Sequence, residues 1–116
     1  GDTARSRQAA FRVNESKALQ DKTRREAIED LNIAWTNYKA VRNQLIYLKQ
    51  HVDASFKTQE AYDQQFNLGR RTLLDLLDAR HELFQANRAY TSAQYDSLYQ
   101  QYRVLAVMGM LAKQFN

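Results

Sequence analysis

No proline occurs in the 116 residues of this chain, and only two glycines, Gly69 and Gly109, interrupt its interior. A β domain of several strands needs Gly, Pro, Asn or Asp at the corner of each hairpin, and this chain offers little of that turn chemistry. Hydrophobic residues make up 44% and charged residues 26%, which is enough apolar content to fold. The scarcity of turn residues and the apolar content together predict a single all-α domain.

Residues that would carry catalysis or bind a metal are few. The absence of cysteine excludes disulfides, thiolate zinc sites and cysteine nucleophiles. His51 and His81 stand far apart, and neither has a second imidazole within one helical turn, as a metal site would need. We therefore predict no enzyme activity, no catalytic residue, no cofactor and no metal site. The sequence also contains no apolar run of the length that spans a membrane and no signal peptide pattern.

Positive charge concentrates at the N-terminal end. The net charge of +4 lies within residues 1–25, which hold seven bases and three acids. A nucleic-acid-binding protein usually carries such charge over a whole face. Here acids alternate with bases at helical spacing, as in Lys22–Glu26 and Arg25–Glu29. This pattern favours a solvated helical surface over a nucleic-acid patch, and we expect no nucleic-acid partner.

The stretch from residue 31 to residue 66 carries a heptad repeat. Nine of its eleven a and d positions are apolar or aromatic, and the exceptions are Ser55 and Gln59. A seam sustained over five heptads predicts a coiled-coil helix. The seam consists of Leu31, Ala34, Tyr38, Val41, Leu45, Leu48, Val52, Ser55, Gln59, Tyr62 and Phe66.

The hairpin turn is predicted at residues 69–72. The first helix, over about residues 3–68, ends at Gly69, because glycine takes the positive φ that follows a helix C-terminus. Thr72 then reads as the N-cap of a second helix over about residues 73–113, with Asp75 as its capping-box partner. Because a short turn between two long helices makes them antiparallel, the predicted fold is a long antiparallel two-helix coiled-coil hairpin.

The second helix carries more apolar surface than one partner helix covers. Its seam alternates large residues with alanine, which lets two helices approach closely. Two further apolar strips lie beside that seam, so we expect the hairpins to self-associate into a bundle. The seam holds Leu76, Ala79, Leu83, Ala86, Tyr90, Ala93, Ser97, Val104 and Leu111, and the strips hold Leu77, Phe84, Leu98 and Leu105, and Leu74, Tyr95 and Tyr102.

Two acids follow the turn directly. Asp75 and Asp78 are i,i+3 neighbours on one helix face. Acids in a first turn interact favourably with the helix dipole, for about 0.3–1 kcal/mol each, and this effect alone explains the pair adequately. In a symmetric assembly whose tips meet at an axis, the same acids would form a negatively charged ring. Chemistry alone favours the first interpretation.

Tyrosines Tyr90, Tyr95, Tyr99 and Tyr102 recur along the second helix. They are compatible with a stacking platform, but tyrosine at helical spacing is more typical of packing at an interface, where the ring packs and the hydroxyl reaches water.

The tip sequence resembles a known family. Residues 66–79 read FNLGRRTLLDLLDA and resemble the periplasmic tip of TolC-type outer-membrane channels, the outer-membrane efflux proteins. The resemblance continues through ELFQA at 82–86 and GML at 109–111, and AWTNY at 34–38 resembles the descending helix of that family. It covers most of the chain, is strongest from about 60 to 111, and is closest to the outer-membrane components of type I secretion systems. Drug-efflux members share enough of it to remain possible.

This resemblance implies a trimer in the outer membrane of a Gram-negative bacterium, with helical hairpins forming a tunnel across the periplasm. The tunnel would export proteins or small molecules, together with a periplasmic adaptor protein and an inner-membrane transporter. The chain would be the periplasmic hairpin of the second repeat. We expect it to be a fragment that lacks the barrel strands, which alone would contact the membrane, the first-repeat hairpin and the signal peptide.

The resemblance also assigns roles at the tip. Arg71 matches the arginine that ties neighbouring hairpins shut. Phe66 stands where the prototype has a tyrosine and is assigned to the same tip latch, although phenylalanine has no hydroxyl with which to form a hydrogen bond. By the same resemblance, Asp75 and Asp78 would line the gate constriction of the tunnel. Leu68, Gly69 and Arg70 would lie where the periplasmic adaptor protein docks.

A second class of function fits the heptads equally well. A helical-hairpin adaptor or a spectrin-like interaction module would show the same periodicity. Flanking sequence discriminates between the two, because a signal peptide and β segments favour the channel whereas flanking helical repeats favour the adaptor.

Overall fold

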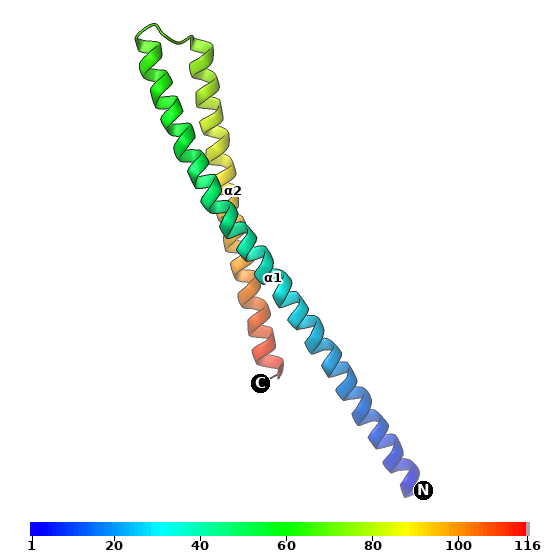
Figure 1. The fold of residues 1–116 in the computed structure, drawn as a ribbon. Helices are drawn as coiled ribbons and strands as arrows, with labels where there is room; N and C mark the ends of the chain where they lie inside the picture. The colour runs from blue at the N-terminus through cyan, green and yellow to red at the C-terminus, as the bar shows by residue number, and fades with distance from the viewer. Residues whose placement is uncertain (116) are drawn as a thin grey trace. The chain divides into compact units, whose positions relative to one another are not determined.

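A computed structural model describes residues 1–115 as two α-helices, α1 (Asp2–Asn67) and α2 (Leu73–Phe115), which are joined by one turn (Figure 1). No strand occurs in residues 1–115, so the predicted all-α helical hairpin is confirmed. The helix bounds lie within one or two residues of those expected from the sequence. Neither helix of this described range contains a stretch apolar and long enough to cross a membrane.

The chain forms two compact units. One consists of residues 37–101, which we call the hairpin unit. The other combines the start of α1, residues 1–36, with the end of α2 from Tyr102 onward, and we call it the open-end unit.

The heptad seam forms the core of the hairpin unit. Every a and d position predicted here is buried or half-buried, except Phe66, which is 37% exposed. Alanine on α2 lets the two backbones approach, and the larger α1 residues fill the space between the alanine layers. The buried members are Ser55, Leu76, Ala79, Ala86 and Ala93, each no more than 7% exposed.

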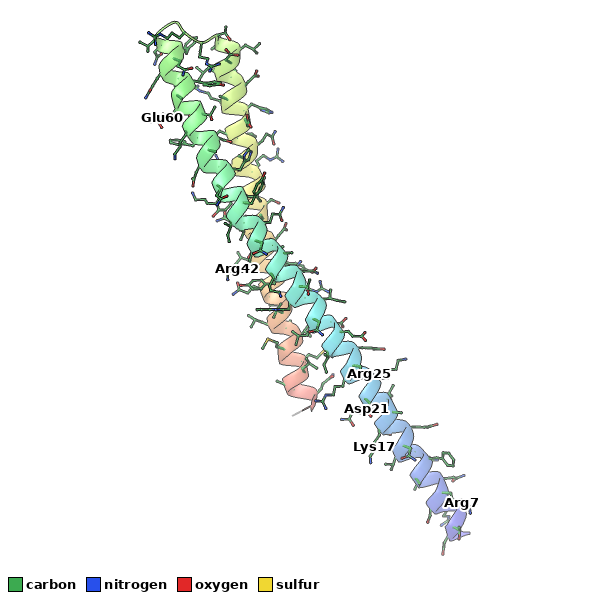
Figure 2. All side chains as sticks on the ribbon, viewed as in Figure 1. Arg7, Lys17, Asp21, Arg25, Arg42 and Glu60 are labelled. Atoms are coloured by element: carbon green, nitrogen blue, oxygen red, sulfur yellow. The ribbon has the colours of Figure 1, made fainter. Side chains whose placement is uncertain are left out.

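The open-end unit has a smaller core. Ala27, Ala34 and Val104 are buried there, and Leu31 and Leu111 are half-buried. Residues 1–26 are all exposed, and Figure 2 labels four charged side chains of this stretch, those of Arg7, Lys17, Asp21 and Arg25. This exposure agrees with the predicted solvated helical surface.

Outside the seam, α2 keeps large apolar side chains in solvent. In the hairpin unit these belong to both strips predicted beside the seam, and the open-end unit exposes Tyr102 and Leu105 in the same way. In the hairpin unit the seam of α2 is therefore buried, whereas the two strips beside it together form a second apolar stripe that stays in solvent. The exposed side chains of this second apolar stripe are Leu74 at 67%, Leu77 at 52%, Phe84 at 58%, Tyr95 at 70% and Leu98 at 61%.

Candidate functional site

The turn at the tip begins with a Schellman motif. Gly69 has a φ of 72°, and its N–H donates to the carbonyl of Phe66 at 2.9 Å. The N–H of Arg70 donates to the carbonyl of Gln65 at 2.8 Å. These two bonds satisfy carbonyls that the end of α1 would otherwise leave unpaired, and the positive φ that they require explains the glycine.

Thr72 caps the start of α2. Its Oγ1 accepts a hydrogen bond from the N–H of Asp75 at 3.1 Å, and its carbonyl accepts the first helical bond, from Leu76, at 3.2 Å. The predicted N-cap is therefore confirmed. The carboxylate of Asp75 lies toward Arg71, with Oδ2 3.9 Å from Nη1.

Arg71 lies at the centre of a polar cluster that joins the two helices. Its Cζ lies 3.9 Å from the centre of the Tyr62 ring, and its Nε donates to Oε1 of Gln65 at 2.6 Å. The cluster therefore comprises Tyr62 and Gln65 from α1, Arg71 from the turn, and Asp75 from α2. The side chain of Arg71 is 35% exposed, so water screens the ion pair only in part.

A second contact joins the helices further from the turn. Nη2 of Arg80 lies 2.9 Å from Oδ1 of Asp63, and Nε2 of Gln59 donates to the other oxygen of that carboxylate. Both partners of the ion pair are partly exposed, which keeps its contribution to stability near or below about 1 kcal/mol.

The two predicted gate acids have different surroundings. Asp75 is half-buried beside Arg71, whereas Asp78 is exposed and its carboxylate forms no hydrogen bond or ion pair within residues 1–115. Asp75 lies in the first turn of α2, where the helix dipole favours negative charge, and Asp78 lies in the second turn, beyond most of that effect.

The predicted docking residues lie at the surface of the turn. Leu68 is 67% exposed, and Gly69 and Arg70 are exposed as well. Phe66, predicted as part of a latch, is 37% exposed and contributes its carbonyl to the turn. The structure thus places all the predicted tip residues within one turn and its two flanking helix ends.

A small cavity of about 160 Å³ interrupts the seam away from the tip. Its walls include Ser55 and Ala79, whose small side chains leave the space, and His51 and Glu82 also line it. His51 is half-buried, while His81 is exposed on α2. Residues 1–115 contain no group of three acidic or imidazole side chains placed to hold a metal ion.

Comparison with known proteins decides the family. The profile of the family described as Outer membrane efflux protein matches residues 2–110. The chain belongs to this family. The family is a class of transport proteins rather than of enzymes, and the resemblance seen at the tip is confirmed.

Three curated relatives share similarity with this efflux-family chain. Outer membrane protein TolC of Vibrio cholerae serotype O1 is 27% identical over 112 residues, which are 97% of this chain and 26% of the relative. Outer membrane protein TolC of Escherichia coli K12 is 23% identical over 108 residues, and the protein of the same name from Salmonella enteritidis is equally similar. The chain thus spans about a quarter of the length of these relatives. A comparison with solved structures gave no significant match.

Sequence reasoning did not assign a functional role to Tyr62 or Gln65 in this efflux-family chain. Tyr62 was placed in the seam, where it is half-buried, but its contact with Arg71 crosses the turn and has no helical periodicity. One sequence signal could have predicted this contact. An aromatic residue stands at a seam position within the last two turns of α1, and an arginine follows the glycine of the hairpin turn. The contact between Asp63 and Arg80 was missed for the same reason.

Proposed function

We propose that this chain is a periplasmic tunnel segment of a trimeric outer-membrane channel that exports proteins or small molecules. The observation that carries the proposal is the second apolar stripe of α2, which stays in solvent beside the buried seam. A wall of adjoining hairpins would cover that stripe, because each hairpin would then have a neighbour on the face that its own α1 does not reach. Membership of the outer membrane efflux protein family supports this use of the stripe.

The hairpin tip would form the entrance of the tunnel. Asp75 and Asp78 stand on the first two turns of α2, and copies of them around a threefold axis would line a constriction with negative charge. Rings of carboxylates attract cations and discourage anions. Arg71 would help to hold the tips together, as the family resemblance implies, while Phe66 would contribute only packing.

The exposed turn would serve as a docking surface. Leu68 offers an apolar contact, and Gly69 and Arg70 beside it are accessible. We propose that a periplasmic adaptor protein binds there and connects the channel with an inner-membrane transporter. The names of the relatives support an outer-membrane location for the whole protein, with this segment in the periplasm.

Ion selectivity in planar bilayers tests the entrance. In the full-length protein, replacement of both Asp75 and Asp78 by alanine should lower the preference of single channels for cations and weaken block by multivalent cations. The matched control is Asp53→Ala, which removes an acid that Lys49 already pairs at 3.2 Å. Selectivity that stays unchanged in the double variant would contradict the proposed entrance.

A further inference from the structure

Arg71 is held from both helices of its own hairpin. The Tyr62 ring lies 3.9 Å from its Cζ, Gln65 accepts from its Nε at 2.6 Å, and Asp75 lies 3.9 Å from its Nη1. The ring and the Gln65 oxygen position the guanidinium, and its Nη1 lies at ion-pair distance from Asp75, beyond hydrogen-bond length. Arg70, the neighbouring arginine, is exposed and provides an internal comparison.

We propose that Tyr62 and Gln65 are positioning residues that hold Arg71 beside Asp75, so that the uncompensated negative charge of the tip resides on Asp78. The consequence for ions rests on the proposed function, whereas the positioning itself is a property of this chain alone.

Tyr62 is suited to this role because the seam fixes its ring. It is half-buried at the last seam position of α1 before the exposed Phe66, and Leu76 of the α2 seam is only 5% exposed. A guanidinium is planar and weakly hydrated, so it stacks on an aromatic face more readily than an ammonium does. The ring therefore provides a preformed surface for a side chain that would otherwise lose much rotamer freedom on ordering.

Gln65 sets the rotation of the guanidinium on that surface. Its Oε1 takes the Nε–H, which leaves the Nη groups to point elsewhere, and Nη1 lies on the side of Asp75. Hydrogen bonds from a charged donor are stronger than neutral ones, and this bond together with the contact on the Tyr62 ring defines the orientation of the guanidinium.

The two acids of the tip consequently differ. Asp75 shares its surroundings with a fixed positive charge, and Asp78 has no such partner within the described range of 1–115. At separations of a few ångströms, a partly exposed cation offsets much of the potential of a neighbouring carboxylate. Asp78 is therefore the acid that a passing ion would sense first.

Arginine NMR on this chain tests the positioning. The Nε–H of Arg71 should resonate away from that of Arg70, shifted by the Tyr62 ring, and should exchange with water about two- to fivefold more slowly, the factor that a cation–π contact corresponds to. Tyr62→Phe keeps the ring and should preserve both signatures. Tyr62→Leu should move the Arg71 signal to the position of Arg70.

The same spectra contain the result that would overturn the positioning. An Arg71 signal unchanged in Tyr62→Leu, or displaced equally by Tyr62→Phe, shows that the ring does not hold the guanidinium. If Tyr62→Leu fails to fold, Gln65→Leu decides instead, because it should accelerate Nε–H exchange while the ring-induced shift remains. Loss of the shift in folded Gln65→Leu, or unchanged exchange, would contradict the assignment of Gln65.

Single-channel selectivity of the full-length protein tests whether Asp75 and Asp78 contribute unequally to the preference for cations. Asp78→Asn should reduce the preference for cations more than Asp75→Asn does. In a chain that also carries Tyr62→Leu, Arg71 is no longer held beside Asp75, so Asp75→Asn should then reduce this preference almost as much as Asp78→Asn. Equal effects in the unmodified background would overturn this inference and leave the proposed entrance standing. Absence of any effect from either acid would overturn the proposed entrance and leave the NMR result to decide the positioning.

Discussion

At the scale of single residues, Gly69 is the position of the turn that tolerates the fewest other residue types. A Cβ built there would meet no atom within 4 Å, so space does not restrict it. The restriction comes from its φ of 72°, which L residues with a side chain adopt only at a cost. Gly109 has equal space but lies inside α2, where glycine only weakens the helix.

Alanine at these two glycines should therefore change stability in opposite directions. Gly69→Ala should lower the free energy of unfolding by about 1–2 kcal/mol, since the left-handed conformation penalises the added Cβ. Gly109→Ala should raise it by up to about 1 kcal/mol. Urea denaturation at a fixed protein concentration measures both. A change of the same sign for both variants would contradict the role of the turn.

The tip shows how far residue-level prediction from sequence reaches. The positive φ of Gly69 and the capping by Thr72 were predictable because both depend on neighbours within four residues. The cluster around Arg71 was not, because its aromatic partner lies nine positions earlier across the turn and nothing in the helical period relates them. The heptad pattern predicts Tyr62 as a seam residue, which its half-buried position confirms, whereas its contact with Arg71 depends on how the turn folds back.

At the scale of elements, the heptad phase determines which face of each helix is buried. Every a and d position from 31 to 62 is buried or half-buried, and so is every position of the α2 seam from Leu76 to Leu111. Periodicity was sufficient because a hairpin has only one internal interface. It did not predict the cavity at Ser55 and Ala79, since the volume left by two small side chains depends on how their layers interleave.

The alanine layers of α2 lead to a prediction about packing. Ala86 is 2% exposed, and Ala86→Leu should destabilise the hairpin by about 1–3 kcal/mol because the added atoms push the helices apart. Ala89 is exposed on the same helix, so Ala89→Leu should change stability by no more than about 0.5 kcal/mol. Thermal unfolding followed by circular dichroism compares them. Similar melting temperatures for the two variants would contradict close packing at Ala86.

At the scale of the whole molecule, the exposed strips of α2 favour association. The chain should not remain a dispersed monomer at high micromolar concentration, and sedimentation velocity should reveal larger species. Phe84→Glu together with Leu98→Glu should shift the chain toward monomer, because charge on both positions opposes burial.

A matched control for this association uses exposed polar residues of the same helix. Gln85→Glu together with Gln94→Glu adds the same charge to α2 without removing apolar surface, and it should leave most of the association in place. A chain that sediments only as a monomer at high micromolar concentration would contradict the bundle.

The central claim is that the tip of this hairpin lies on the path of conduction. The chain contains no cysteine, so Asp78→Cys introduces a single thiol into these residues. In full-length channels in a planar bilayer, a bulky thiol reagent should reduce the single-channel current of Asp78→Cys and leave the unmodified channel unaffected. Complete labelling, verified by mass, with no change in current would contradict the claim.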